Sequence, residues 1–375
     1  MAKLLGMGGR KTMVGGLALC LFAALSAPHT FAASSGSGAA DGDADVSVVS
    51  VFAVGGAISG AVLDGDYLYV TTSTTLSIYD VSNPIAPVLL AAKPSPHFIY
   101  GELLSTQGEI LLLNDGIGGG TLDIWNVEDK TNPILAGSIS GVNDEHVSCL
   151  IQCTWAYGSN GSIIDLRVPQ EPDLRSESWK VVSGAGDGHV HRLDEYRPGF
   201  MATAPRGGNP VFLDVRRPLK PKLVARARVP VLSPNMFLYT SWLTGGNDRF
   251  AMSSVENGQC NNEFQGALLT WDTKGWPKDR RFEVAGKYRY AGRTNDENCL
   301  AYYFSVHPDF DDGGLVLLPN GLEGTRIIEV AKNGQMEEVD SFVLPTSDVW
   351  LAFWIDEEIF YALNSTGEVY ILRYE

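Results

Sequence analysis

Leu76-Ser77-Ile78-Tyr79-Asp80-Val81 is a short apolar run that ends at an acidic residue, and a turn at Asn83-Pro84 follows it directly. The same pattern, an apolar run and then an acidic residue or Asn, recurs along the whole chain. The further copies are Leu122-Asp123-Ile124-Trp125-Asn126-Val127, Ser162-Ile163-Ile164-Asp165-Leu166, Val211-Phe212-Leu213-Asp214-Val215, Leu268-Leu269-Thr270-Trp271-Asp272, Arg326-Ile327-Ile328-Glu329-Val330 and a degenerate Glu368-Val369-Tyr370-Ile371-Leu372. A unit that returns so often indicates a repeat architecture.

The spacing of the copies indicates which repeat architecture this is. We take one marker residue from each copy, namely Asp80, Asn126, Asp165, Asp214, Asp272, Glu329 and Leu372. By subtraction, the steps between them are 46, 39, 49, 58, 57 and 43 residues. This period is typical of a β-propeller blade of four strands. No stretch shows sustained helical periodicity, so we expect almost no helix.

The first unit shows how each blade is built. Gly60-Ala61-Val62-Leu63 predicts an inner strand, and a turn at Asp64-Gly65-Asp66 leads into Tyr67-Leu68-Tyr69-Val70-Thr71. The alternation and the β-branched residues of the second run favour a half-buried strand. The marker strand comes next. Pro84 then interrupts the ladder, because proline donates no backbone hydrogen bond, and Val88-Leu89-Leu90 starts the outer strand.

The last unit contains only three predicted strands, and the other end of the chain offers the fourth. The three are Trp350-Leu351-Ala352-Phe353, Ile359-Phe360-Tyr361-Ala362 and Val369-Tyr370-Ile371-Leu372, whereas Val46 to Phe52 precedes the first inner strand. Pairing of the two ends removes an open sheet edge. We therefore predict an all-β fold, a seven-bladed β-propeller that the N-terminal outer strand closes by pairing with the C-terminal blade.

The first 45 residues have the layout of an export signal and a linker. Lys3, Arg10 and Lys11 precede an apolar stretch from Met13 to Ala27, and small residues flank a cleavage site near Ala32. This layout predicts a signal peptide at 1–32, a flexible linker at 33–45 and the propeller at 46–375. We expect a secreted, periplasmic or cell-envelope protein with no membrane span after cleavage. An uncleaved anchor is the rival, but the apolar run is short for a bilayer.

The charge balance is strongly acidic. The chain has 28 Lys and Arg residues against 44 Asp and Glu residues, a net charge of −16, and three of the basic residues lie in the predicted signal peptide. Nucleic acids and anionic lipids are bound by basic residues that neutralise phosphate groups. We therefore expect no nucleic-acid partner, and we interpret the acidic surface as a source of solubility.

Four cysteines remain after the predicted cleavage, namely Cys149, Cys153, Cys260 and Cys299. An even number in an exported chain predicts disulfides, and four cysteines allow three pairings. We favour Cys149 with Cys153, which would staple a tight hairpin, and Cys260 with Cys299, which lie in loop-rich segments of neighbouring blades. A zinc site is the alternative, but the first pair has no matching second pair.

The marker strand resembles the repeat of the LVIVD-repeat proteins of bacterial and archaeal envelopes. Leu76 to Pro84 is its closest match, and the resemblance covers roughly Val46 to Glu375. His146-Val147-Ser148-Cys149, Asp187-Gly188-His189-Val190 and Ser305-Val306-His307-Pro308-Asp309-Phe310 also look like segments of secreted members. The resemblance implies a propeller and an outer location but no agreed reaction. Similar proteins often carry His where this chain has Tyr239 and Tyr302.

The inner strands of a propeller line its central channel, and their first residues gather at one mouth. By alignment of the units, these positions are near Ser59, Tyr100, His146, His189, Tyr239, Tyr302 and Trp350, with Glu145, Asp144 and Asp187 beside them and His191 deeper in the channel. Imidazoles with nearby carboxylates can hold a transition metal or work as an acid/base pair. The alternative is structural, because two histidines at a mouth are fewer than most catalytic zinc sites use.

No sequence motif completes a catalytic set. The chain has no nucleophile elbow, P-loop, zincin helix or dinucleotide fingerprint. The main hypothesis is therefore an exported binding or scaffold propeller that presents one mouth to a protein, peptide or glycan. The alternative is a metal-assisted or acid/base enzyme around His146 and His189, with a divalent metal as the cofactor. A structural envelope component held by partners is the third possibility.

Overall fold

The computed structural model describes residues 45–115, 120–142, 144, 146–186, 188–228, 237–243, 250–256, 262–290, 299–344 and 348–375, apart from the side chains at 237, 239 and 241–243. These residues belong to one compact unit, Ala39–Glu375. Nearly all regular structure in them is β. The one helix among the described residues is α1 (Trp179–Ser183), and no helix there is long and apolar enough to cross a membrane.

After β1, the strands of the described residues follow one another along the chain in six groups of four and a last group of three. They are β1 (Val46–Ala53); β2 (Ile58–Asp64), β3 (Tyr67–Thr72), β4 (Thr75–Asp80) and β5 (Val88–Pro94); β6 (Ser105–Gln107), β7 (Ile110–Asn114), β8 (Thr121–Asn126) and β9 (Ile134–Ser140); β10 (Val147–Leu150), β11 (Trp155–Gly158), β12 (Ile163–Asp165) and β13 (Asp173–Leu174); β14 (Leu193–Arg197), β15 (Phe200–Thr203), β16 (Val211–Asp214) and β17 (Lys222–Ala227); β18 (Phe237–Leu243), β19 (Phe250–Glu256), β20 (Ala267–Asp272) and β21 (Arg281–Arg289); β22 (Ser305–Val306), β23 (Gly314–Pro319), β24 (Thr325–Val330) and β25 (Met336–Phe342); and β26 (Val349–Trp354), β27 (Ile359–Asn364) and β28 (Glu368–Tyr374).

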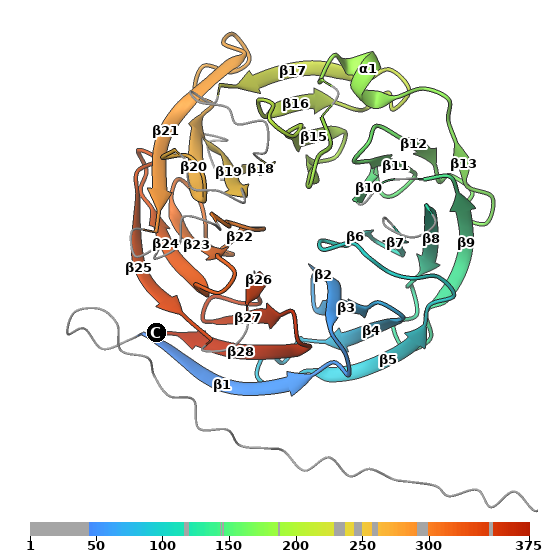
Figure 1. Cartoon of the computed structure of the whole chain (residues 1–375), viewed down its shortest axis with the longest axis horizontal. Coiled ribbons are helices and arrows are strands. Elements are labelled where there is room, and N and C mark those ends of the chain that lie inside the picture. The colour runs from blue at the N-terminus through green and yellow to red at the C-terminus, as the bar shows by residue number, and fades with distance from the viewer. Residues whose placement is uncertain are drawn as a thin grey trace, which may run out of the picture. The chain divides into compact units, whose positions relative to one another are not determined.

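Antiparallel pairing within each group makes a small sheet. In the described residues, the four-stranded sheets are β2-β3-β4-β5, β6-β7-β8-β9, β10-β11-β12-β13, β22-β23-β24-β25 and β1-β28-β27-β26. The strands β14 to β21 form one eight-stranded sheet, because β17 and β21 pair in parallel at Arg226↔Arg281 and Ala227↔Phe282. The sheets stand around a common centre, with the first strand of each group innermost (Figure 1).

Every marker segment predicted from the sequence is a β-strand. The seven are β4, β8, β12, β16, β20, β24 and β28, and each contains or abuts its marker residue. The acidic residue or Asn at the end has a physical role. Its side chain accepts a hydrogen bond from the backbone N–H two residues later, as in Ser82 N to Asp80 Oδ1 (2.9 Å) and Glu128 N to Asn126 Oδ1 (2.9 Å). This turn ends the strand and starts the connection to the outer strand.

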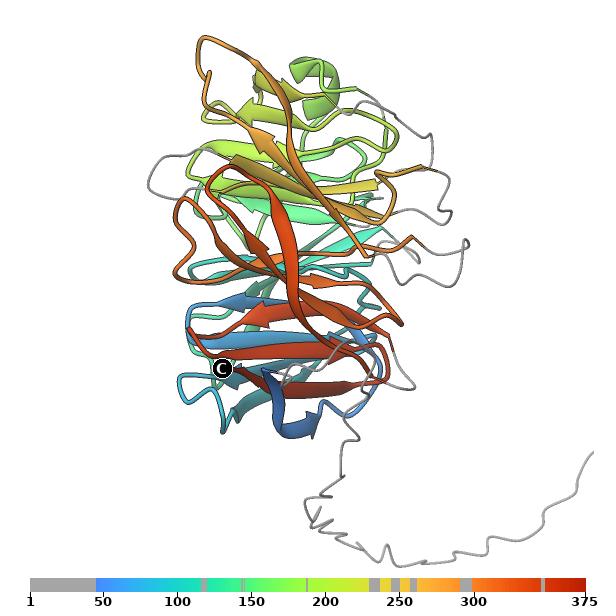
Figure 2. The same ribbon diagram turned by 90° about the vertical axis from the view of Figure 1, so that its left-hand side faces the viewer.

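The first described strand and the last strand of the chain lie side by side. β1 pairs with β28 in antiparallel register from Val46↔Tyr374 to Ala53↔Glu368, with one irregularity between Val48 and Ser50. Figure 2 shows the blue N-terminal strand against the red C-terminal ones. The predicted partnership between the two ends of the propeller unit is therefore present in the structure.

The core lies between neighbouring sheets. One buried cluster joins Tyr69 and Ile78 of the β2–β5 sheet to Leu111 and Trp125 of the β6–β9 sheet. Another contains Trp271, which is fully buried, and residues of the β14–β17 strands. Trp125 and Trp271 thus fill gaps between neighbouring sheets. Because each sheet buries both of its faces against its neighbours, many small cores hold the unit together.

Candidate functional site

A cavity of about 500 Å³ lies among the inner strands β2, β6, β10, β14, β22 and β26. Figure 1 places these strands nearest the centre of the unit. The lining mixes polar and apolar side chains, among them Leu63, Leu103, Ser105, Gln107, Ser148, Arg192, Asp194, Glu195, Tyr303, Phe304 and Phe353. The centre of the propeller therefore contains a chamber of the size that small ligands occupy.

Three histidines come together close in sequence to residues that line this chamber, since His146 lies two residues before Ser148 and His191 directly precedes Arg192. His146 directly precedes β10, and His189 and His191 lie in the segment that leads into β14. One ring nitrogen of each lies within 4.8 Å of the others. The ring centroids are 6.0 Å apart for His146 and His189, 5.1 Å for His146 and His191, and 5.2 Å for His189 and His191. We call His146, His189 and His191 the histidine cluster.

Local packing explains why the two histidines before β14 gather with the third. Val190, between them, is fully buried in a core with Trp179 and Leu193, so its flanking residues point away from that core. Hydrogen bonds also fix the backbone. Arg206 N donates to His189 O (2.6 Å), and Ser159 N donates to His146 O (2.8 Å). The positions of the imidazoles thus follow from well-anchored backbone.

Burial favours the neutral forms of His146 and His189. His146 is only 4% exposed. Its burial lowers the pKa of the imidazole well below the usual value, and the neighbouring His191 and His189 add to this effect. Burial also lowers the pKa of His189 to about 4, with further contributions from His191, Lys180 and Arg206. Neutral imidazole is the form that binds metal ions.

Two polar side chains orient the rings. Asn160 Oδ1 lies 3.0 Å from His189 Nδ1, and Glu256 Oε2 lies 3.2 Å from His191 Nδ1. Both contacts place a proton on Nδ1 and make Nε2 the atom of these rings that can accept a metal ion. The buried Nδ1 of His146 has no hydrogen-bond partner among the described residues. A histidine set held by outer amide and carboxylate groups has the usual design of a metal-binding centre.

Asp144 holds the backbone next to the histidine cluster through hydrogen bonds. Its buried carboxylate accepts hydrogen bonds from Asn160 N–H and from Ser159 Oγ. Despite these bonds, burial raises the pKa of Asp144 above the usual value. The carboxylate also fills the space beside Gly158, where an added Cβ would lie 2.0 Å from Asp144 Oδ2, so only glycine fits there. Asp144 therefore positions the Asn160 loop.

Tyr302, Tyr303 and Glu102 lie close to the segment that carries His191. The Tyr303 hydroxyl lies 3.1 Å from Glu102 Oε2 and 3.0 Å from His191 O. Burial raises the pKa of Tyr303 well above the usual value, and the nearby Glu102 and Glu256 act in the same direction. Burial also raises the pKa of Tyr302, again with Glu256 and Glu102 as neighbours. Both phenols stay protonated, and the Tyr303 hydroxyl donates to Glu102 and to His191 O.

The other residues predicted to lie at the channel mouth are not part of the histidine cluster. Tyr100 is half-buried and forms a backbone bridge with Asp115, and Trp350 in β26 packs against an apolar cluster together with Tyr302. Tyr239 lies in β18, but its side chain is outside the described residues. Glu145 and Asp187 are also outside them. The structure therefore brings together three of the predicted side chains, His146, His189 and His191, and places Tyr302 near the carboxylates around them.

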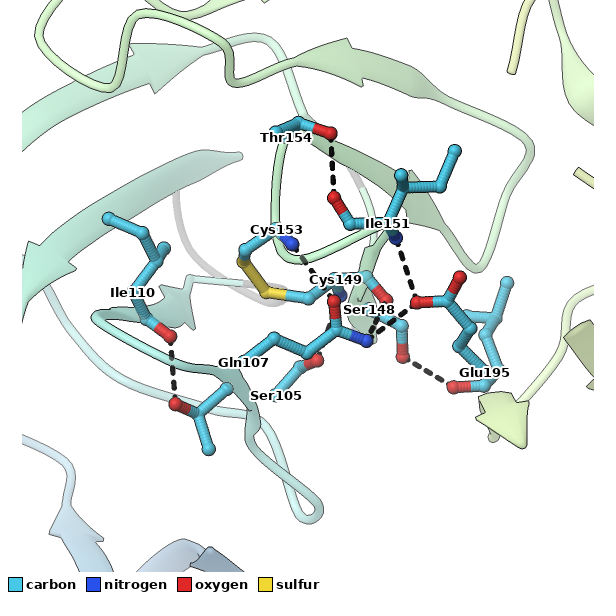
Figure 3. Close-up of a disulfide and its surroundings, with 11 residues drawn as sticks. Ser105, Gln107, Ile110, Ser148, Cys149, Ile151, Cys153, Thr154 and Glu195 are labelled. Carbon is cyan, nitrogen blue, oxygen red and sulfur yellow. Dashed lines mark hydrogen bonds between the residues drawn. A yellow bond between two sulfur atoms is a disulfide. The ribbon is translucent and has the colours of Figure 1, made fainter. Parts of the chain in front are cut away.

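A disulfide fixes the hairpin that follows His146. Cys149 and Cys153 are bonded, and Ile151, Gln152 and Cys153 all have positive φ angles of 54° to 56°. Glu195 accepts from Ile151 N (2.8 Å), and Gln107 Oε1 accepts from Cys153 N (2.9 Å) (Figure 3). The hairpin is thus tied to both neighbouring inner strands. Cys299 is also disulfide-bonded, and its predicted partner Cys260 lies outside the described residues.

Part of this arrangement was not predictable from the sequence. His191 was expected deeper in the channel on the same strand face as His189, and the structure places both residues before β14, which begins at Leu193. Asn160, Glu256 and Tyr303 were also not predicted. The His189-Val190-His191 spacing around a core valine was the available signal for the third ligand. No local sequence pattern marked Asn160, Glu256 and Tyr303 as neighbours of the histidines, because they come from other parts of the chain.

Comparison with solved structures identifies the fold. The chain is similar to the β-propeller domain of Cps50 (Swd1) from Myceliophteria thermophila, with a TM-score of 0.60 and 12% sequence identity over 84% of this chain and 96% of that one. At this identity the likeness concerns the fold alone. The protein is a β-propeller built from four-stranded sheets. No protein-family model and no curated protein matches the sequence.

Proposed function

We propose that this chain is a binding propeller whose central ligand is a divalent transition-metal ion held by His146, His189 and His191. The observation that carries the proposal is the convergence of three ring nitrogens within 4.8 Å of one another. Imidazole nitrogen suits zinc, copper, iron and nickel, whereas calcium and magnesium prefer oxygen. Bonds of about 2.1 Å would draw the nitrogens closer together by rotation of the rings.

The energetics of the cluster support this proposal. A buried, neutral imidazole whose ring nitrogen lacks a partner costs free energy, on the order of 1–3 kcal/mol for such a group. His146 is such a residue among those described. A metal ion would satisfy it together with the Nε2 atoms of the other two rings. Asn160 and Glu256 already hold those rings through Nδ1.

A metal-assisted enzyme is the second candidate function. Three protein ligands leave an open coordination position, which is the pattern of catalytic zinc sites, whereas structural zinc sites have four protein ligands. The cavity of about 500 Å³, which is lined by Ser148 and Arg192 close in sequence to His146 and His191, offers room for a substrate. His146, His189 and His191 would hold the ion, and the ion would supply Lewis acidity or an activated water.

The propeller that carries this site is proposed to have seven blades. The eight-stranded sheet consists of two four-stranded units, β14–β17 and β18–β21, which gives seven units with the other sheets. The pairing of β1 with β28 supports a closed ring. We also propose membership of the LVIVD-repeat family and export through the signal peptide at 1–32. The acidic chain and the disulfide support an outer location.

Metal analysis tests the proposal. The purified protein is stripped with chelator, reloaded separately with Zn²⁺, Cu²⁺ and Co²⁺, and titrated by calorimetry. We expect one equivalent to bind, and at least a 100-fold loss of affinity in each of His146→Ala, His189→Ala and His191→Ala. His307→Ala is the matched control, since His307 contacts Glu357 O away from the cluster, and it should bind like wild type.

Two results would refute the metal site: no binding of any of these ions by the folded wild-type protein, or equal binding by the cluster variants. Circular dichroism of each variant shows whether the fold is kept. The Co²⁺ form adds an independent readout, because its visible spectrum reports the coordination of the ion. Wild-type protein should show a tetrahedral or five-coordinate spectrum that His189→Ala lacks.

A further inference from the structure

Arg192 is a charged residue that lines the central cavity without a full set of partners. Its side chain is only 15% exposed. Nη2 lies 3.3 Å from Asp194 Oδ2, which is a long contact for an ion pair. The Nε and Nη1 atoms are buried and have no hydrogen-bond partner among the described residues. A buried guanidinium in this state costs free energy, and an acceptor oxygen from a ligand would relieve the cost.

The other charged groups on the cavity wall already have partners. Glu195 accepts from Ile151 N (2.8 Å), Gly199 N (2.5 Å) and Gln107 Nε2 (2.6 Å). Its charge is therefore used to hold the disulfide hairpin. Asp194 contacts Arg192 once. Arg192 is thus the cationic residue of the described wall, and two of its nitrogen atoms have donor capacity left.

The rest of the wall indicates what the body of a ligand would contact. Val62, Leu103, Val306 and Phe353 line the same cavity, and the Arg192 guanidinium lies 5.0 Å from the centre of the Phe304 ring. The aromatic face helps to hold the cation in place. Small-molecule sites commonly combine such apolar walls with one or two fixed polar groups. A compact molecule with one anionic end matches this wall.

We propose that the central cavity binds a small organic carboxylate, with its carboxylate on Arg192 and its apolar body against Phe304, Leu103 and Phe353. Arginine suits this role because its planar group keeps its charge and donates to both carboxylate oxygens. The inference goes beyond the metal site and does not need an ion. Failure of the metal-binding proposal would therefore leave the carboxylate-binding proposal untouched, and the reverse also holds.

Calorimetry with a matched pair of probes tests the proposal. Hexanoate and hexanamide have similar size and apolar bodies, but only hexanoate carries the charge. The folded, metal-free wild-type protein should bind hexanoate at least tenfold more tightly than hexanamide. Arg192→Gln should lose at least tenfold in hexanoate affinity and bind the two probes alike. Arg192→Lys should lie between wild type and Arg192→Gln, because it keeps the charge without the planar group.

Arg216→Gln is the control variant. Arg216 also pairs with an aspartate two residues away, Asp214, but at the surface, and its loss should leave hexanoate binding unchanged. Equal affinity of wild type for both probes, absence of hexanoate binding, or full binding by Arg192→Gln would each overturn the proposal. Titration of Zn²⁺ into Arg192→Gln separates the two sites: wild-type zinc affinity with lost hexanoate binding shows a local effect.

Discussion

Glu256 Oε2 lies 3.2 Å from His191 Nδ1, so a carboxylate at the end of β19 orients an imidazole in the segment before β14. The two residues come from neighbouring four-stranded units of the propeller. A carboxylate in this position fixes the tautomer of the ring and raises the basicity of Nε2. The histidine cluster is therefore held across a boundary between units and depends on their relative position.

Glu256→Gln should weaken metal binding without unfolding the protein. The amide can still contact His191, but it cannot supply the negative charge that strengthens the ligand, so we expect the metal affinity to fall about tenfold or more. Calorimetric titration with Zn²⁺ measures this. Glu329→Gln, at an exposed marker position on β24, should bind like wild type. Equal affinities for the two variants would show that Glu256 has no part in the site.

Asp144→Asn should change how stability depends on pH. Burial raises the pKa of Asp144 in the folded protein. The stability linked to this group is therefore fully present below the unfolded pKa of about 3.9, and it is lost as pH rises through the raised folded pKa. Asparagine removes that loss, so wild type should lose more stability than the variant between pH 4 and pH 8. Urea unfolding at several pH values measures the difference, and parallel curves would contradict the expectation.

Removal of the Cys149–Cys153 bond should destabilise the protein modestly. The bond closes a loop of only five residues, for which the chain-entropy account gives about 2 kcal/mol. The double variant Cys149→Ser/Cys153→Ser should show this loss in urea unfolding. A reductant should then lower its stability only by the contribution of the disulfide that contains Cys299. If the reductant affects the variant as much as wild type, the hairpin bond is not the one that matters.

Deletion of β1 tests the closure of the propeller. A chain that starts at Val54 lacks the partner of β28 and the half-buried Phe52, whose packing alone is worth about 3 kcal/mol or more. The freed strand edge should also promote self-association at micromolar concentration. A chain that starts at Asp45 is the control and should remain monomeric by light scattering. Equal stability of the two chains would argue against closure through β1.

Much of the fold was predictable because the repeat signal is local. An apolar run and an acidic residue that caps the following turn lie within a few residues of each other, so each marker strand from β4 to β28 is visible in the sequence. The strand Val46 to Phe52 was predictable because the last unit has only three predicted strands and needed a fourth. The Cys149–Cys153 bond followed from close spacing in a predicted hairpin.

The site was less predictable because its geometry depends on irregular segments. His189 and His191 lie in an irregular segment before β14, so alternation along a strand did not show that His191 joins His146 and His189. Asn160 and Glu256 reach the imidazoles from a hairpin and from the end of another strand. Only the folded backbone brings these residues together. The same is true of Arg192, whose incomplete pairing is a property of its surroundings.

The sheet shared by the two ends of the described chain also constrains the order of folding. Val46 pairs with Tyr374, so this contact joins residues that are 328 positions apart by subtraction. Contacts of such long separation form late, because the loop entropy must be paid before they stabilise anything. In a chain that is still being synthesised, β1 therefore has no pairing partner until β28 is available. Any helper protein that assists this molecule would act during that interval.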